Sequence, residues 1–210
     1  MPSARDTRNR ISGVESTRQI TRAMQLVATS KMNRAQEAVR AARPYADKIG
    51  DVLRDLSRAI PGDEGVHPLF EKRPEHKVAV VVLSTNRGLC GALNTNVTRA
   101  ALELAGAGRE ANPNVEYSVI GMGRVGVRML AGTLPIAANF DDVPDRPLIV
   151  DVIPIVRMLI EGFELHAFDA VDVVYPDFVN TLTQRSEHVR LLPITRPEAD
   201  EEDERDPDYI

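Results

Sequence analysis

The first sixty residues form a long run of helix-forming sequence, interrupted only by Pro44, Gly13 and Gly50. Ser3 is expected to cap its start, with Asp6 in the first turn. Apolar and small residues recur along it at steps that alternate between three and four, a period typical of a helix that supercoils around a partner helix. We call the residues of this period the seam: Val14, Thr17, Thr21, Met24, Ala28, Lys31, Ala35, Ala38, Ala42, Tyr45, Ile49, Val52 and Leu56.

A helix of this length needs a partner. About 55 residues give a rod of about 80 Å, which Pro44 can kink. The rest of the chain holds no second helical stretch of comparable length. Because an isolated helix gains too little stability without packing, the seam predicts a partner helix from another chain or from a segment outside these residues. The alanines in its middle would let that helix approach closely.

Charge divides the chain into parts. Residues 1–60 carry 12 Lys and Arg against 6 Asp and Glu, whereas the remainder carries 14 against 25 and much of that acid lies at the C-terminus. We therefore expect a basic coiled-coil helix over 1–60, a Pro/Gly-rich linker over 61–76, a globular domain over 77–195 and an acidic segment over 196–210. A basic helix that leads into heptads is also typical of zipper-type DNA-binding proteins, although those carry leucine where this seam carries alanine.

After the linker, strand and helix patterns alternate. Apolar runs predict strands over 77–84, 116–121, 134–140 and 170–179, and amphipathic runs predict helices over 91–107, 124–131 and 148–165. Pro154 would be tolerated only near the first turn of the last of these helices. Residues 179–194 are expected to be an extended segment that leads out of the domain. This alternation predicts an α/β fold with a Rossmann-like, mostly parallel sheet covered by helices.

One motif invites an enzymatic interpretation. Gly121, Gly123 and Gly126 match the pattern G-x-G-x-x-G between a predicted strand and a predicted helix, and Asp141 and Asp142 follow at roughly the distance of a ribose-binding acid. The motif follows the second strand of the unit, however, whereas a dinucleotide fingerprint follows the first. A dinucleotide-binding oxidoreductase remains an alternative at this point.

A second small-residue turn, LSTNRGLCGALNTN (Leu83–Asn96), follows the first predicted strand. It lacks the spacing and the lysine of a phosphate-binding P-loop. Cys90 near a helix start would need a base to act as a nucleophile, and none of the four histidines lies in a supporting local pattern. We interpret the turn as a structural corner, and we expect no catalytic residue, metal site or cofactor.

Compartment signals point to the cytoplasm. A single cysteine excludes a disulfide within the chain, and the sequence contains neither a secretory apolar region nor a run of the roughly 20 apolar residues that span a bilayer. We expect no direct membrane span.

Two long motifs resemble those of the gamma subunit family of F-type ATP synthases. They are TRQITRAMQLVATSKMNRAQEAVRAARPYA (Thr17–Ala46) and STNRGLCGALNTN (Ser84–Asn96). The segments VNTLTQ and LLPI and the acidic stretch after them are similar as well. The resemblance runs from Ser3 to the end of the chain.

The resemblance implies a noncatalytic central-stalk rotor that couples proton flow to the cycling of catalytic sites. Its partners would be the alpha and beta subunits, the epsilon subunit and the membrane c-ring, with no nucleic acid, at the cytoplasmic face of a bacterial plasma membrane. The partner helix of the seam would be a C-terminal helix beyond residue 210. Met24 falls where the family meets an acidic loop of the beta subunit, and the expected rotor–stator contacts are Arg8, Arg18, Arg22, Met24 and Lys31.

Overall fold

The computed structural model describes residues 3–59, 67–144 and 146–194 of the chain. These fall into two compact units, Met1–Ile60 and Pro61–Ile210. The expected acidic segment 196–210 and residues 61–66 of the expected linker lie outside the described residues. The expected four-part division therefore stays a prediction, and the two units are described separately.

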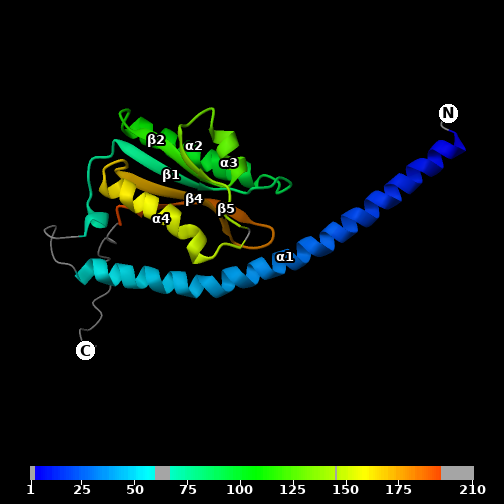
Figure 1. Ribbon diagram of the computed structural model, residues 1–210, viewed down its shortest axis with the longest axis horizontal. Coiled ribbons are helices and arrows are strands. Elements are labelled where there is room, and N and C mark those ends of the chain that lie inside the picture. The colour runs from blue at the N-terminus through cyan, green and yellow to red at the C-terminus, as the bar shows by residue number, and fades with distance from the viewer. Residues whose placement is uncertain (1–2, 60–66, 145, 195–210) are drawn as a thin grey trace. The chain divides into compact units, whose positions relative to one another are not determined.

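The first unit is the helix α1 (Ala4–Ala59), which is 56 residues long and continuous through Pro44 (Figure 1). Its start is capped as expected, because the Ser3 hydroxyl accepts the Asp6 backbone N–H at 3.2 Å and an Asp6 carboxylate oxygen accepts the Ser3 N–H at 3.2 Å. This reciprocal pair satisfies two backbone donors that a helix N-terminus otherwise leaves unpaired.

The second unit is built on a five-stranded sheet with strand order β3-β2-β1-β4-β5. The strands are β1 (Lys77–Leu83), β2 (Glu116–Met122), β3 (Ile136–Phe140), β4 (Ala170–Phe178) and β5 (Gln184–Leu192). All neighbouring strands are parallel except β4 and β5, which form an antiparallel pair. The α/β class and the mostly parallel sheet are thus confirmed.

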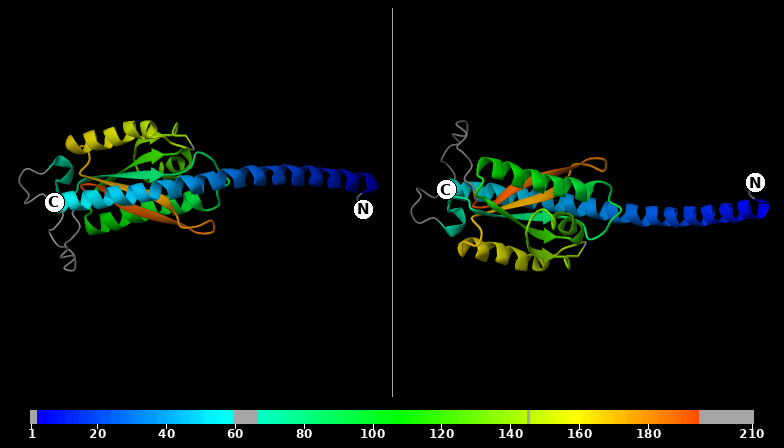
Figure 2. Two further views of the ribbon diagram at one scale, coloured as in Figure 1. Left: turned by 90° about the horizontal axis from the view of Figure 1, so that it is seen from below. Right: turned by 90° about the horizontal axis from the view of Figure 1, so that it is seen from above.

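Helices cover both faces of this sheet. They are η1 (Pro68–Phe70, a 3-10 turn), α2 (Leu93–Ala111), α3 (Arg124–Leu130) and α4 (Ile149–Glu164). Figure 2 shows α2 on one side of the sheet and α4 on the other. Because successive side chains of a strand point to opposite faces, β1 supplies both cores.

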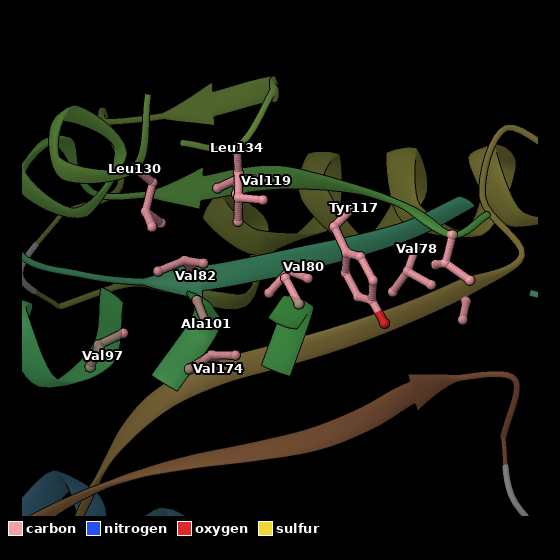
Figure 3. Close-up of a cluster of buried hydrophobic side chains, with 13 residues drawn as sticks. Val78, Val80, Val82, Val97, Ala101, Tyr117, Val119, Leu130, Leu134 and Val174 are labelled. Atoms are coloured by element: carbon pink, nitrogen blue, oxygen red, sulfur yellow. The ribbon is translucent and has the colours of Figure 1, made fainter. Parts of the chain in front are cut away.

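Each face has its own apolar core. Val78, Val80 and Val82 of β1 pack with Val97 and Ala101 of α2 on one face (Figure 3). On the other face, Ala79 and Val81 pack with the α4 residues Ile155, Leu159 and Phe163. Burial of β1 on both sides explains its nearly continuous valine run.

Three sequence expectations need correction. Residues 184–192 form the edge strand β5 rather than a segment that only leads outward. Helix α2 begins at Leu93 instead of residue 91, because Gly91 has a φ of 61° and belongs to the preceding turn. Pro154 lies in the second turn of α4, not in the first; Val150, the residue whose carbonyl loses its donor, is 62% exposed.

Candidate functional site

The seam of α1 carries a row of exposed apolar side chains. Val14 is 68% exposed, Met24 56% and Ile49 43%, and the alanines between them are exposed as well. A soluble protein rarely leaves so many apolar side chains in contact with water along one element. The exposure fits the expectation that a partner helix covers the seam. The side chain of Leu56 lies outside the described residues.

The hydroxyl groups of the two threonines in the seam are already hydrogen-bonded within α1. The Thr17 hydroxyl donates to the Gly13 carbonyl at 2.9 Å, and the Thr21 hydroxyl donates to the Thr17 carbonyl at 3.0 Å. Each hydroxyl therefore keeps a hydrogen bond within α1, and a helix packed against the seam would not leave it unsatisfied.

The expected rotor–stator contacts do not share one face of α1. At roughly 100° per residue, Arg8, Arg18 and Arg22 lie within an arc of about 80°. Met24 and Lys31 lie roughly on the opposite side, and both belong to the seam. We call the side that carries the three arginines the outer face. The helix thus brings the arginines together but separates them from Met24 and Lys31.

Leu26 on this outer face was not predicted from the sequence. It lies one turn after Arg22 and is 68% exposed. Its position opposite the seam follows from helical spacing alone, but the 3.5-residue period of the seam does not include it. The outer face therefore offers an apolar contact next to its cationic side chains.

The corner that follows β1 closes over the start of α3, where a dinucleotide would bind. The first three N–H groups of α3 all have protein acceptors: Arg124 N–H donates to Asn86 Oδ1 at 3.0 Å, Val125 N–H to the Thr85 carbonyl at 3.1 Å, and Gly126 N–H to Ser84 Oγ at 3.0 Å. A pyrophosphate needs such amides to be free. Here the protein itself occupies them.

The glycines of the motif serve the packing of this corner. A Cβ atom at Gly123 would lie 2.2 Å from the Ser84 carbonyl oxygen, and one at Gly126 would lie 2.7 Å from the Ser84 side chain. Ser84 thus packs directly against both glycines. Asp141 contributes its backbone carbonyl, which accepts from the Asn86 side chain at 2.9 Å. The dinucleotide interpretation is not supported.

Cys90 takes part in the same corner as a packing residue. The Asn94 side-chain amide donates to Cys90 Sγ at 3.1 Å and to the Thr85 hydroxyl at 2.8 Å, and Asn94 Oδ1 accepts the Thr85 N–H at 3.0 Å. A cavity of about 390 Å³ lies beside these residues, between the ends of β1 and β2. The side chain of Asn94 thereby joins the end of β1 to the start of α2.

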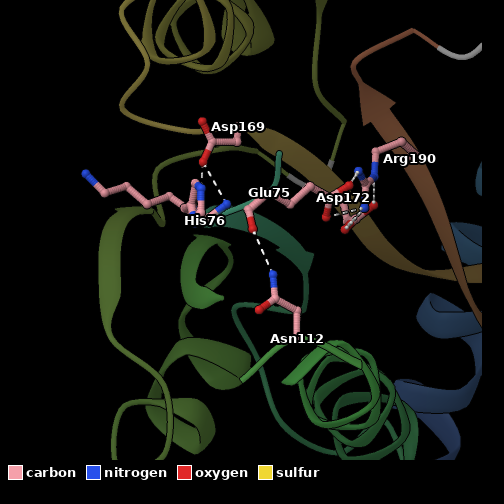
Figure 4. A network of polar contacts seen from close by, with 7 residues as sticks. Glu75, His76, Asn112, Asp169, Asp172 and Arg190 are labelled. Carbon is pink, nitrogen blue, oxygen red and sulfur yellow. Dashed lines mark hydrogen bonds and ion pairs between the residues drawn. The ribbon is translucent and has the colours of Figure 1, made fainter. Parts of the chain in front are cut away.

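A polar network at the opposite end of the sheet was also not predicted (Figure 4). Arg190 on β5 binds the Asp172 carboxylate with Nε–Oδ1 2.6 Å and Nη2–Oδ2 3.2 Å, and binds Glu75 with Nη1–Oε1 2.5 Å. Asp172 is 3% exposed. Burial alone would lower the pKa of Arg190, but its hydrogen bonds to Glu75 and Asp172 outweigh this and raise the pKa. Burial, followed by the nearby Glu75, raises the pKa of Tyr117.

No helix in the described parts of the chain combines the length and the apolar content that crossing a bilayer requires.

Comparison with known proteins identifies the family. The family model described as ATP synthase matches residues 3–210. The ATP synthase gamma chain of Legionella pneumophila (strain Paris) is 37% identical over 201 residues, which cover 95% of this chain and 68% of the relative. That of Acidithiobacillus ferrooxidans (strain ATCC 53993 / BNL-5-31) is 40% identical over 202 residues, which cover 96% of this chain and 69% of the relative.

Solved structures share the fold. A chain of the Tetrahymena thermophila mitochondrial ATP synthase central stalk and c-ring superposes with a TM-score of 0.63 at 21% identity, covering 86% of this chain and 80% of that one. A chain of the Euglena gracilis mitochondrial ATP synthase rotor superposes with a TM-score of 0.54 at 17% identity, covering 88% and 61%. The long capped helix, the mostly parallel sheet and the matched sequences agree, and the chain belongs to the ATP synthase gamma chain family.

Proposed function

We propose that this chain is the noncatalytic central-stalk rotor subunit of an F-type ATP synthase, coupling proton flow through a membrane ring to conformational cycling of catalytic beta subunits. The observation that carries the proposal is α1, a continuous helix of 56 residues whose seam is exposed from Val14 to Val52. A shaft is the use of such a helix that also accounts for the family match.

The mechanism requires two different surfaces on α1. The seam would pack against a second helix of the same subunit to form a stiff two-stranded axle. The outer face would turn inside the ring of alpha and beta subunits. Because the two surfaces differ in charge and shape, rotation would present different contacts to each beta subunit in turn and would bias its binding state.

The chemistry of the outer face suits a moving contact. Arg8, Arg18 and Arg22 would attract acidic loops of the stator, and this attraction changes with angle because charge interactions fall with distance. The apolar Leu26 would slide without an ion pair that locks it. Met24 and Lys31 remain proposed contacts with the stator. Because both lie in the seam, this contact requires that the second helix does not cover these two residues.

The globular domain would bind the epsilon subunit and the membrane c-ring. The Tetrahymena structure is one of a central stalk together with a c-ring, and the domain of this chain has the corresponding fold. The proposal puts the protein at the cytoplasmic face of a bacterial plasma membrane as a peripheral subunit. Support for this placement comes from the bacterial relatives.

A pair of charge additions tests the shaft assignment. Met24→Lys and Leu26→Lys add the same charge two residues apart on opposite faces of α1. In the assembled complex with the full-length subunit, we expect ATP hydrolysis to persist and proton pumping per ATP hydrolysed to fall. Loss in Met24→Lys alone would assign the stator contact to the seam side, and loss in Leu26→Lys alone to the outer face. Normal coupling in both variants would contradict the proposal.

The two alternative functions have simple tests. Fluorescence titration with NADH should show no binding, and micromolar binding that is lost in Gly123→Val would support an oxidoreductase. A gel-shift assay should show at most weak DNA binding that disappears with added salt. A sequence-specific shift at moderate salt would support the DNA-binding alternative.

A further inference from the structure

Two segments connect the globular domain to the rest of the chain. One is the lead-in segment, residues 67–76, which follows α1 in the sequence and ends at β1. The other is the lead-out segment, residues 190–194, which comprises the last three residues of β5 and the two that follow it, and which ends the described part of the domain. If the chain is a rotor, as proposed above, any torque carried by the backbone between shaft and domain passes through these two segments.

The two segments are fastened to each other. Arg190 in the lead-out segment binds Glu75 in the lead-in segment through both carboxylate oxygens, at 2.5 and 3.4 Å. The Ile194 N–H donates to the Leu69 carbonyl at 2.8 Å. Residues 75 and 190 are 115 positions apart in the sequence. These contacts therefore join the segment where the chain enters the domain to the segment where the chain leaves it.

The fastening is anchored in the sheet. Arg190 also binds the buried Asp172 on β4 through Nε and Nη2. Paired, parallel hydrogen bonds from a planar guanidinium fix direction as well as distance, which a single ammonium group cannot do. Arg190 therefore holds β4, β5 and the lead-in segment in one geometry (Figure 4).

The lead-in segment has further attachments within the domain. Arg73 Nη2 donates to the Phe163 carbonyl at 2.6 Å, and its guanidinium lies over the Phe163 ring at 4.0 Å. The Asp169 carboxylate accepts the backbone N–H groups of His76 and Lys77 at 2.9 and 2.8 Å. These bonds hold the segment to the end of α4 and to the residue before β4, whereas the Glu75–Arg190 and Leu69–Ile194 contacts hold it to the lead-out segment.

We propose that Arg190 is a positioning residue which, with Glu75, clasps the lead-in and lead-out segments so that the globular domain turns with the shaft instead of twisting against it. The clasp stiffens the rotor and takes no part in nucleotide chemistry. Its partner atoms lie in the unit that contains the sheet, so the domain carries the device by itself.

Glu75→Gln is the most direct test, because it removes one charge of the clasp and leaves the buried Asp172–Arg190 pair intact. Glu71→Gln is the matched control. It removes the same charge from the same segment, and within the described residues the Glu71 side chain makes no hydrogen bond or ion pair. Arg190→Lys keeps the charge but loses the fork geometry.

The measurement uses the assembled complex with the full-length subunit. The catalytic hexamer is immobilised and stalled without nucleotide, and the angular fluctuation of a probe on the globular domain is recorded. We expect a broader angular distribution for Glu75→Gln and Arg190→Lys than for the wild type, with Glu71→Gln unchanged and ATP hydrolysis retained in all of them.

The outcomes separate this inference from the proposed function. A wild-type subunit that neither assembles nor rotates would refute the rotor assignment itself. A rotating wild type with an unchanged angular width in Glu75→Gln and Arg190→Lys would overturn the clasp alone. A lower melting temperature with unchanged angular width would likewise overturn it, because the contacts would then serve only stability.

Discussion

Replacing Gly123 by alanine tests whether the G-x-G-x-x-G motif is structural. Gly123 precedes α3 with a φ of 105° and a ψ of 139°, a conformation that residues with a side chain rarely adopt. An added Cβ would lie 2.2 Å from the Ser84 carbonyl oxygen. Real Cβ atoms essentially never approach another atom closer than 3.0 Å, so the two backbones would have to separate by about 0.8 Å.

The expected cost has two parts. Backbone strain at this conformation contributes about 1–3 kcal/mol. Moving Ser84 also weakens its hydrogen bonds to the Gly123 carbonyl and the Gly126 N–H, both 3.0 Å long, and each such bond is worth about 1 kcal/mol. The sum is about 3–5 kcal/mol, a large share of the roughly 5–15 kcal/mol that stabilises a typical domain.

Urea unfolding measures this loss. Tyrosine fluorescence is a suitable signal, because the chain has no Trp and Tyr117 is 6% exposed in the core. With a denaturant slope of about 2 kcal/mol per molar, the midpoint should fall by roughly 2 M. Gly132→Ala is the control: a Cβ there meets nothing within 4 Å, and its midpoint should stay close to that of the wild type.

The result that would refute this reasoning is a Gly123→Ala midpoint equal to that of Gly132→Ala. The corner would then have room for a side chain, and the argument that the protein fills the phosphate position would lose its basis.

Two further predictions concern acid stability and the start of α1. Burial would raise the pKa of Asp169, but hydrogen bonds from the His76 and Lys77 N–H groups outweigh it and lower the pKa from its ordinary value. A carboxylate whose pKa is lower in the folded protein than in the unfolded chain stabilises the fold at a pH above the unfolded-chain pKa. This stabilisation is lost as the pH falls through the pKa of the folded protein. Unfolding midpoints measured from pH 7 to pH 3 should therefore fall less in Asp169→Asn than in the wild type, and equal slopes would contradict the assignment. Ser3→Ala should cost the first turn of α1 about 0.5–2 kcal/mol. Faster amide hydrogen exchange at Asp6 would show this, and unchanged exchange would argue against the cap.

Local patterns predicted much of the fold. The Ser3–Asp6 cap and each step of the seam join residues only three or four positions apart in the sequence, so capping chemistry and periodicity were enough to predict α1. The valine run of β1 indicated a strand buried on both faces. The predicted start of α2 was two residues too early. The residue types at Gly91 and Ala92 did not indicate that Gly91 has a positive φ and belongs to the preceding turn.

Long-range pairing was beyond these patterns. Strand β5 is largely exposed on both faces, so its alternation was too weak to distinguish an edge strand from an extended tail. The Arg190 network joins residues far apart in the sequence, and no local rule pairs them. The capped start of α3 escaped notice for the same reason, since its acceptors Ser84, Thr85 and Asn86 come from a different turn.

The proposed contacts on α1 show a different limit. Arg18 and Arg22 were grouped with Met24 because they lie close to it on the same predicted helix. Helix geometry places Met24 on the opposite side from the arginines. Proximity in sequence was therefore a poor guide to a shared surface. The single proposed contact surface becomes two, one on the outer face with the arginines and one in the seam with Met24.

The Ser84–Asn86 corner has a consequence for a subunit that would operate beside ATP-binding catalytic sites. A helix start with free amides would compete for the phosphates of a metabolite present at high concentration, and its occupancy would vary with cellular energy state. Since Ser84, Thr85 and Asn86 already accept the first three N–H groups of α3, this helix start offers no free amide to such phosphates.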